Sequence, residues 1–449
     1  MKKYLVLPVV LACCLHNAAN AAEDFSSYMQ LRYRYEQDDN FSIKFYGEHP
    51  KKGEADDGFL LQRLRAGFTY KYSENVLFSV GVQDSRVYGQ GLPEGTFDNA
   101  ALGHPHDHFE DYTEPYNTYV QLKNVFGSDF QVRVGRQVIK YGNNRIFGPG
   151  EWGNSGRYVW DAAVVSYKKD KDFIDLFWGA HIIHEPDVIS WGHRHYFNGA
   201  GVYSHFEFTS FFMTEPFLVF KYDTHDTFQG ESGAIGDYFS VFPGMRITGD
   251  LPHDFFYDVT LVWQSGTYGA DDVEAWGAHG HFGKKFPELP FKPCPSVEYS
   301  YASGDGDPKD GVRETFEGVF GARDRMYGRM NLFDWSNLKD LQFNIDVEPL
   351  KTVHVKAEFH RFWLDEIKDG WSLNPKLYRD KTGMSGDEVG DEFDIVITWK
   401  PDELLPKEYG GIELQTGYSH FRPGGFTDKI ADDCDANWYF IQITYSLKF

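Results

Sequence analysis

The sequence has few cysteines, a deficit of positive charge and no long apolar run. Four Cys occur in 449 residues, and 44 Lys and Arg stand against 67 Asp and Glu, for a formal net charge of -23. A membrane-spanning helix needs about 20 consecutive apolar residues, so a helical membrane protein is excluded. The acidic balance excludes nonspecific binding to nucleic acid. Because low-complexity tracts are absent and aromatic residues make up 17% of the chain, intrinsic disorder is excluded too.

The first residues have the features of a cleaved secretory signal. Lys2 and Lys3 form a charged start, residues 4–15 are apolar, and Ala19-Asn20-Ala21 is a small-x-small cleavage site. We therefore expect a signal peptide over 1–21.

The mature chain, 22–449, contains no linker and is expected to form one domain. A lipoprotein signal that ends at Cys13 is the alternative for the N-terminus. It is disfavoured because Leu11 is bulky beside that cleavage position and the apolar segment would be very short.

The last residues of the chain alternate with a period of two. Apolar side chains occupy every second position and polar side chains lie between them: Tyr439, Ile441, Ile443, Tyr445, Leu447 and Phe449 against Gln442, Thr444, Ser446 and Lys448. This period is typical of a β-strand with one apolar face. A final strand that ends in Phe resembles the assembly signal of bacterial outer-membrane barrels, and the alternative is the edge strand of a soluble sandwich.

The same alternation recurs along the whole chain. Strands are predicted near 29–36, 63–72, 75–85, 116–124, 129–138, 157–168, 173–182, 198–209, 214–222, 236–249, 254–264, 273–283, 295–303, 340–348, 353–363, 389–400, 410–420 and 436–449. The total is about eighteen, an even number as expected of bacterial single-chain barrels.

Short and long connections alternate between these strands. Tight turns are expected at 72–75, 125–129, 169–172, 250–253 and 349–352, whereas long polar loops include 37–59, 86–115, 304–339 and 364–388. Outer-membrane barrels have short periplasmic turns and long extracellular loops, an asymmetry that a soluble sandwich has no reason to show. We predict an all-β fold, a transmembrane antiparallel up-and-down β-barrel of about 18 strands in the bacterial outer membrane, in contact with its lipid.

The two cysteines of the mature chain are expected on opposite sides of the membrane. Cys294 ends a connection of the periplasmic class, and Cys434 precedes the last strand on the extracellular side. About 25 Å of barrel wall separates these positions, so we expect no disulfide between them.

One stretch of the chain carries a motif. Residues 134–142 read VGRQVIKYG, and Asn144-Arg145, Trp152-Gly153-Asn154, Gly156-Arg157 and Trp160-Asp161-Ala162 follow. The stretch resembles the GRQ...YG..R...W.N.GR..DA pattern of the alginate export family of outer-membrane barrels. Two later segments, YSYASGD at 299–305 and GDEFD at 390–394, are similar to further segments of that family. The resemblance implies a monomeric barrel that passes polysaccharide or other solutes across the outer membrane.

A channel for a polyuronate needs cationic side chains in its lumen. Each uronate carries a carboxylate, and the guanidinium group of Arg offers a bidentate fork for it. Parity places six candidates on the polar face of their strands: Arg32, Arg34, Arg63, Arg65, Lys123 and Arg133. The first four lie on neighbouring strands and are expected to form one patch.

The motif adds further candidates for substrate binding. Arg145 and Arg157, in or beside the motif loop, are positioned to extend inward over the pore, and Asp161 closes the motif. Arg136 shares parity with the outward Val134. It therefore needs either a bulge at the preceding glycine or a position at the barrel rim.

Bracing of the barrel wall is the alternative role for these cations. Acidic residues at lumen-facing parity are Glu36, Asp175, Asp258, Glu298, Asp346, Glu358, Glu392 and Asp394. They match the basic residues in number, whereas a strongly positive pore requires more basic than acidic residues. Either the cations gather at one constriction while the acids lie elsewhere, or the substrate is not a polyanion.

Two loops contain potential metal ligands. Asp305, Asp307 and Asp310 resemble an oxygen-rich calcium loop, but the bidentate Glu of an EF-hand is missing, so a solvated loop is favoured. Histidines at this loop spacing can hold Zn or Cu but are more often unliganded, and they are His104, His106 and His108. No resident cofactor is expected.

Three functions stay open at this point. The first is passive transport of anionic or neutral saccharide, and the second is a selective pore for small solutes whose inward loops narrow it. An outer-membrane hydrolase is the third, but the chain shows no spacing of nucleophile and base that supports catalysis, so no enzyme is expected.

Overall fold

The computed structural model of the chain describes residues 24–40, 56–89, 109–149, 151–155, 159–182, 195–323, 325–373, 377–401 and 410–448. The expected signal peptide, the three loop histidines at 104, 106 and 108, and Arg157 lie outside these described residues. None of the helices among the described residues is long or apolar enough to span a bilayer.

Eighteen strands form a closed wall. They are β1 (Phe25–Asp39), β2 (Asp57–Ser73), β3 (Val76–Tyr88), β4 (Asp111–Leu122), β5 (Phe130–Val138), β6 (Val159–Lys169), β7 (Asp172–Ile182), β8 (His195–Thr209), β9 (Phe212–Gln229), β10 (Ile235–Leu251), β11 (Phe255–Tyr268), β12 (Asp271–Lys284), β13 (Cys294–Ala302), β15 (Leu338–Leu350), β16 (Val353–Trp363), β19 (Glu388–Trp399), β20 (Gly411–Pro423) and β21 (Ala436–Lys448).

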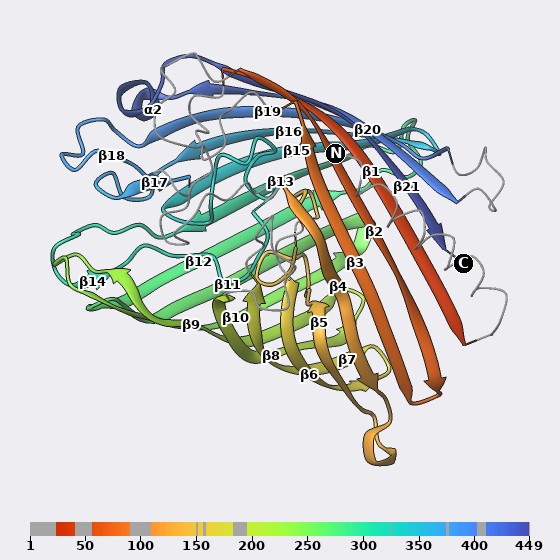
Figure 1. Ribbon diagram of the computed structural model, residues 1–449. Helices are drawn as coiled ribbons and strands as arrows, with labels where there is room; N and C mark the ends of the chain where they lie inside the picture. Colours follow the sequence, from red (N-terminus) through yellow and green to blue (C-terminus); the bar gives the residue numbers. More distant parts are fainter. Residues whose placement is uncertain are drawn as a thin grey trace.

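Each wall strand pairs antiparallel with the next one along the chain, and the last pairs with the first. Tyr28 of β1 lies opposite Lys448 of β21, so the sheet has no free edge at its ends. Figure 1 shows β1 and β21 side by side in the closed ring. The predicted antiparallel barrel is confirmed.

A few short elements lie outside the wall. β14 (Val312–Arg313) pairs parallel with the start of β12, while β17 (Gly370–Ser372) and β18 (Leu377–Arg379) form a small sheet of their own. A single helical turn, α2 (Gly425–Ile430), precedes β21.

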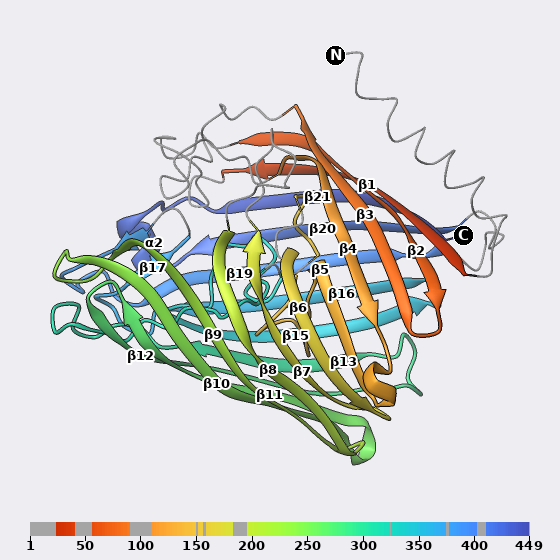
Figure 2. The same cartoon turned by 60° about the horizontal axis from the view of Figure 1, so that its bottom comes forward.

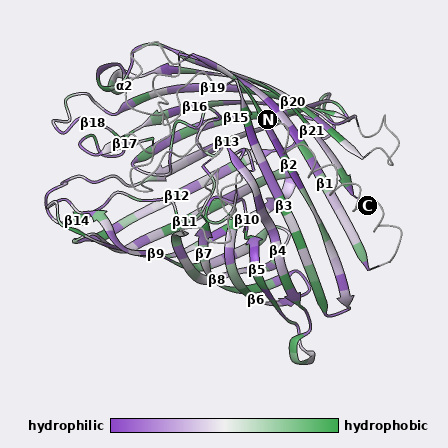
Figure 3. Cartoon of the chain, in the orientation of Figure 1, coloured by the Kyte–Doolittle hydropathy of each residue, from purple (hydrophilic) through white to green (hydrophobic). Residues whose placement is uncertain are grey.

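The outer surface of the wall is apolar because strand residues alternate between the two faces. On β1, Tyr35 is 42% exposed while the neighbouring Arg34 is 1% exposed, and on β21 Ile441 is 58% exposed while Gln442 is 5% exposed. Figure 3 shows this alternation as hydrophobic and hydrophilic colours that change along each strand. The apolar side chains therefore point out of the barrel, as contact with lipid requires.

The two ends of the barrel differ in the length of their connections. One end, called the turn end here, has connections at 74–75, 123–129, 170–171, 210–211, 252–254, 285–293, 351–352 and 400–410. The other end, called the loop end, carries the long loops together with β14, β17, β18 and α2 (Figures 1 and 2). Two connections at the loop end, 230–234 and 269–270, are short hairpins.

Candidate functional site

Two long loops fold into the ring of strands. The first loop, 139–158, joins β5 to β6, and the second loop, 303–337, joins β13 to β15 (Figures 1 and 2). They pair with each other through their backbones. Phe320 N–H donates to the Ile146 carbonyl at 3.0 Å, and Gly148 N–H donates to the Phe320 carbonyl at 3.1 Å. We call the described parts of both loops the inner plug.

The pairing of the two loops depends on a glycine. A Cβ at Gly321 would lie 1.7 Å from the carbonyl oxygen of Arg145, which is backbone and cannot move aside independently. Beside it, Ala322 N–H donates to the Asn144 carbonyl at 3.0 Å. The close approach of the two backbones therefore requires the absence of a side chain at this position.

Aromatic side chains pack at the junction of the two loops. Phe147 is fully buried, and the distances from its ring centroid are 5.1 Å to Trp160 on β6, 4.9 Å to Phe177 on β7 and 5.3 Å to Phe320. Rings at these separations interact favourably beyond the area that they bury. The inner plug thus has a hydrophobic core of its own against one side of the wall.

At another part of the wall, the first loop docks against arginines of β1 and β2. Arg32 donates to the Gly153 carbonyl at 2.9 Å and Arg63 donates to the same oxygen at 3.0 Å. Arg34 donates to the Trp152 carbonyl at 2.7 Å and lies over the Trp152 ring, 3.9 Å from its centroid. Three predicted lumen cations therefore hold the loop in place.

Strand β3 adds neutral contacts to the same loop segment. Ser85 Oγ donates to the Asn154 carbonyl at 2.7 Å, and Gln83 Nε2 donates to the Ser155 carbonyl at 2.6 Å. The Asn154 amide nitrogen in turn donates to the Phe109 carbonyl at 2.8 Å. The segment 151–155 is thus fastened to the wall mainly through its own backbone oxygens.

Two further arginines of this wall do not contact the inner plug. Arg65 on β2 donates through Nε to Gln83 Oε1 at 2.6 Å and lies over the Tyr116 ring, 4.4 Å from its centroid. Arg133 on β5 donates through Nε to Gln137 Oε1 at 2.5 Å and lies 5.4 Å from the Tyr119 centroid. Among the described residues, the terminal nitrogens of both guanidinium groups have no hydrogen-bond partner.

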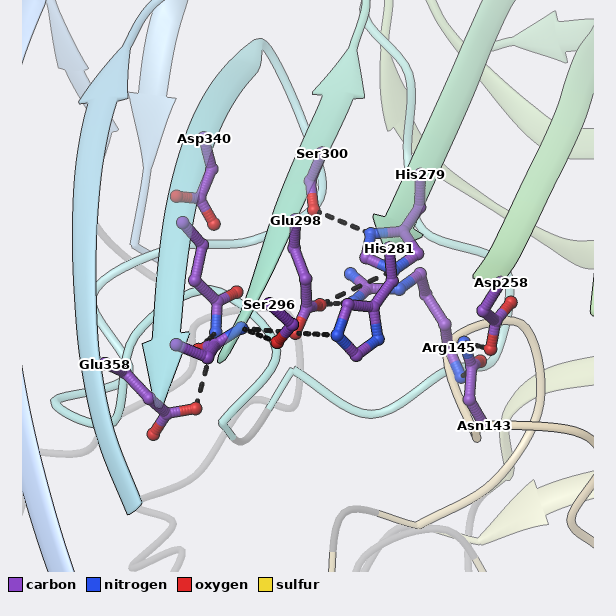
Figure 4. A network of polar contacts seen from close by, with 12 residues as sticks. Asn143, Arg145, Asp258, His279, His281, Ser296, Glu298, Ser300, Asp340 and Glu358 are labelled. Atoms are coloured by element: carbon purple, nitrogen blue, oxygen red, sulfur yellow. Dashed lines mark hydrogen bonds and ion pairs between the residues drawn. The ribbon is translucent and has the colours of Figure 1, made fainter. Parts of the chain in front are cut away.

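Carboxylates dominate the inner wall from β7 to β19. Glu298 on β13 lies at the centre of one network, with its oxygens 3.5 Å from His279 Nε2 and 3.7 Å from His281 Nε2 (Figure 4). Asn344 Nδ2 donates to Glu298 at 2.9 Å. The first loop brings Arg145 to this network, with Nη2 3.7 Å from Glu298.

The second loop docks on the part of this acidic wall formed by β16 and β19. Arg329 pairs with Glu358, and Met330 N–H donates to Glu392 Oε1 at 2.8 Å. Lys356 Nζ also lies 2.7 Å from Glu358, which is 2% exposed. These buried carboxylates therefore receive a guanidinium group and a backbone N–H from the loop, and Lys356 from β16 itself.

The remaining predicted substrate residues lie in different places. Lys123 follows β4 at the turn end, away from the inner plug. Arg136 lies at the last pair of the β4–β5 ladder, opposite Thr118, and its Nη2 is 2.9 Å from Asp161 on β6. The register of β5 with β6 is unbroken there, so Arg136 occupies the end of a ladder rather than following a bulge in β5.

The proposed calcium residues make separate contacts. Asp305 Oδ1 accepts the Asp307 N–H at 3.1 Å, whereas Asp310 Oδ1 accepts the Val312 N–H at 2.9 Å. Burial, together with contact to the Glu231 carboxyl, raises the pKa of Asp305 to about 8. The backbone N–H of Asp305 donates to Asp369 at 2.9 Å. Asp305 thus joins three connections of the loop end.

The sequence pattern did not reveal how the first loop docks. Parity placed the arginines, but a backbone carbonyl is common to all residues and leaves no mark in the sequence. A signal was nevertheless present in the motif, because Trp152 and Asn154 are its W.N pair and both contact the wall. The tyrosines Tyr116 and Tyr119, which lie under the two remaining arginines, were not singled out.

One protein family matches nearly the whole sequence of the chain. The family model described as alginate export matches residues 24–437. No curated protein matches the chain by sequence.

Several solved barrels superimpose on the chain. Pseudomonas aeruginosa OpdQ does so with a TM-score of 0.61 at 13% identity, covering 96% of this chain and 100% of that one. Acinetobacter baumannii OccAB3 has a TM-score of 0.61 at 13% identity, covering 95% and 100%. Pseudomonas aeruginosa OpdK with vanillate has a TM-score of 0.60 at 12% identity, covering 95% and 99%. At these identities the similarity shows a common fold.

Proposed function

The chain belongs to the alginate export family and is a channel of the bacterial outer membrane, and on this premise we propose that it passes small carboxylate-bearing solutes, sugar acids and short oligouronates, by passive diffusion. The single observation that carries the proposal is the pair Arg65 and Arg133. Both face the lumen, and their terminal nitrogens have no hydrogen-bond partner among the described residues.

The geometry of these two arginines suits recognition of a carboxylate. Each is fixed at Nε by a glutamine and rests on a tyrosine ring, so the outer fork of the guanidinium group is oriented before a solute arrives. A preoriented fork binds both oxygens of a carboxylate and loses little conformational entropy in doing so. Tyr116 and Tyr119, on which the two arginines rest, are both residues of β4.

The distribution of charge supports an anionic solute. The acids at lumen-facing parity match the bases in number, but they occupy a different arc of the wall. Most of the carboxylates lie on β7 to β19, where Arg145, Arg329 and Lys356 are among their partners. The predicted lumen arginines of the wall gather on β1 to β5, whereas Arg246 on β10 is paired with Glu215 and Asp258. Unpaired positive charge is therefore concentrated along one side of the lumen.

The inner plug favours short solutes over a long polymer. The first loop contacts the wall at β1 to β3 and, through Arg145, at β13 on the far side, so it crosses the lumen. A polysaccharide chain would require the segment 151–155 to leave its position. Export of a polymer is the second candidate function, supported by membership of the family and dependent on that displacement.

Single-channel conductance in planar bilayers tests the proposal. We expect anion selectivity in a salt gradient and block by galacturonate and short oligouronates, but not by neutral oligosaccharides of equal length. Arg65→Gln and Arg133→Gln should each weaken block, because each removes one fork. Arg361→Gln is the matched control, since that arginine is 45% exposed on its side chain and pairs with Glu388 at the loop end.

Cation selectivity, or block that is the same for charged and neutral sugars, would refute the proposal for anionic solutes. Undiminished block in the Arg65→Gln and Arg133→Gln variants would move the site elsewhere. The expected monomer is part of the same proposal and is checked by mass measurement in detergent.

A further inference from the structure

Arg32 and Arg63 form a closely matched pair in the part of the wall from β1 to β5, which we call the basic wall. They are direct partners in the register of β1 and β2, and both are buried, at 3% and 5% exposure. Both donate to the same two oxygens of the first loop. The Glu151 carbonyl accepts from Arg32 at 3.1 Å and from Arg63 at 3.3 Å, and the Gly153 carbonyl accepts from them at 2.9 and 3.0 Å.

This arrangement places two like charges side by side without an anion. Among the described residues, no carboxylate lies within 4.0 Å of either guanidinium group, and both Nε atoms are buried without a hydrogen-bond partner. The neighbouring Arg34 differs, because its Nε lies 2.5 Å from Glu36. Like charges opposite each other in a sheet are destabilising, and a buried charge needs a counter-charge or complete hydrogen bonding.

We propose that Arg32 and Arg63 are an oxyanion site which the first loop occupies with the carbonyls of Glu151 and Gly153, and that a solute carboxylate exchanges with these carbonyls and releases the segment 151–155. This inference rests on the proposed function, since it takes the same class of solute. It adds a mechanism of regulation, because the solute itself displaces the segment that narrows the lumen.

The exchange is favoured by the chemistry of the donors. Both kinds of acceptor bond to a charged donor, but a carboxylate also carries a full negative charge and matches the two parallel N–H groups of a guanidinium fork, so its two oxygens can replace two carbonyl oxygens and add Coulomb attraction. The anion also supplies the counter-charge that the pair lacks. The freed carbonyls become accessible to water, which satisfies them as they leave the wall.

The backbone conformation of the first loop at Glu151 favours its release from the arginines. Glu151 has a φ of +62°, a left-handed conformation that is costly for a residue other than glycine. Its side chain is 58% exposed, so it does not hold the backbone in that conformation by burial. Release from the arginines allows this residue to relax. The contacts from Arg34, Gln83 and Ser85 remain, so the segment loosens while the chain stays near the wall.

Hydrogen exchange of the wild-type protein tests the inference directly. The full mature chain in detergent is compared in galacturonate and in glucose, at equal concentration and equal ionic strength set with NaCl. We expect several-fold faster amide exchange across 151–155 in galacturonate, and unchanged exchange in the wall strands, because displacement of the two carbonyls opens only that segment. Equal rates in the two solutions overturn the inference.

Variants separate the role of the arginine pair from general loosening. In the double variant Arg32→Gln with Arg63→Gln, the segment should exchange fast without solute, and galacturonate should add nothing. Arg63→Lys keeps the charge but loses the fork, so its response to galacturonate should weaken. A full galacturonate response in the double variant would also overturn the inference. If the double variant does not insert into the membrane, the comparison of the wild type with Arg63→Lys still tests the inference.

Arg65→Gln makes the failure of this inference distinguishable from failure of the proposed function. Arg65 lies on the same strand as Arg63 but does not contact the first loop. We expect Arg65→Gln to reduce anion block and to keep the galacturonate-induced exchange. Anion block without any induced exchange in the wild type leaves the proposed function standing and overturns the inference alone. Induced exchange without anion selectivity overturns the proposed function alone.

Discussion

The basic wall and the part of the acidic wall formed by β16 and β19 each hold an inward loop, but by opposite means. On β1 and β2, arginines of the wall bind backbone oxygens of the first loop. On β16 and β19, carboxylates of the wall bind a guanidinium group and a backbone N–H of the second loop. Each wall thus selects the loop groups of complementary charge or dipole.

The difference lies in what compensates the buried charge. At the acidic wall, Glu358 meets the full positive charges of Arg329 and Lys356. At the basic wall, Arg32 and Arg63 meet only the dipoles of carbonyl groups and amide oxygens. We infer that the acidic wall contributes mainly to stability, whereas the basic wall keeps cations whose partners are exchangeable.

Removal of Glu358 is expected to have the largest effect and tests whether the acidic wall is the one that stabilises the fold. Glu358→Ala leaves Arg329 and Lys356 near each other without their shared anion, and loss of one partner of a buried ion pair costs about 3 to 5 kcal/mol. We expect the free energy of unfolding in urea, followed by tryptophan fluorescence, to fall by that amount. Conductance should rise as well, because the second loop loses an anchor.

Two controls place this effect on the acidic wall. Glu348→Ala removes a pair with Lys292 at the turn end whose carboxylate side chain is 47% exposed, and it should cost less than about 1 kcal/mol. Arg63→Gln on the basic wall should also cost less than Glu358→Ala, since Arg32 still donates to the same carbonyls. A larger loss from Arg63→Gln would show that the basic wall is the structural one.

A second variant separates the two loops from each other. Gly321→Ala places a Cβ 1.7 Å from the Arg145 carbonyl oxygen, so the backbones must move apart. Overpacking of this kind typically costs about 1 to 3 kcal/mol. We expect a lower free energy of unfolding and a higher single-channel conductance. Gly318→Ala is the matched control in the same loop, because its Cβ would lie 3.9 Å from the nearest atom. The pairing is unimportant if both variants conduct alike.

A smaller effect is expected from a neutral contact of the basic wall. Ser85→Ala removes the hydroxyl that donates to the Asn154 carbonyl at 2.7 Å, and a hydrogen bond of this kind contributes about 0.5 to 1.5 kcal/mol. Amide exchange across 151–155 should rise modestly without galacturonate. Ser26→Ala, at an exposed position of β1, should change nothing. No difference between the two variants would mean that the arginines alone hold the segment.

The sequence predicts which strand side chains face the inside of the barrel better than it predicts which loop groups those side chains contact. Period-two alternation separates Arg32 from Tyr33 on β1, and it placed the arginines on the inner face because any strand sends successive side chains to opposite sides. It does not tell which loop a given arginine meets, since contacts between positions more than a hundred residues apart depend on how the loops fold. The position of Arg136 shows the same limit, because a ladder end is set by the neighbouring strand.

The separation of charge between the walls was also beyond the sequence. Equal numbers of lumen-facing acids and bases are compatible with alternating ladders as well as with two opposed arcs. Only the order of the strands around the ring distinguishes them. In this barrel, strand order is chain order and the ring closes between β21 and β1, so the strands that carry Arg32 and Arg63, β1 and β2, lie in a different arc from β16, which carries Glu358.

The smallest expected effect concerns the loop end and depends on pH. Burial and the nearby Glu231 and Asp369 raise the pKa of Asp305 to about 8, from an ordinary value of 3.8. The folded state therefore prefers the protonated carboxyl, so its contribution to stability is full below about pH 4, falls progressively as pH rises, and is lost by about pH 8. Amide exchange across 303–313, corrected for its intrinsic pH dependence, should accelerate between about pH 6 and 8 and level off above.

Asp305→Asn decides whether the Asp305 carboxyl is responsible for that change. The amide can donate a hydrogen bond toward Glu231 and carries no charge, so exchange across 303–313 should become independent of pH over the same range. The segment 151–155 at the basic wall should show no such step in either protein, because its described anchors are arginines, a glutamine and a serine. A pH step in both segments would mean that the two loops open together, and the contrast between the walls would then reduce to one cooperative plug.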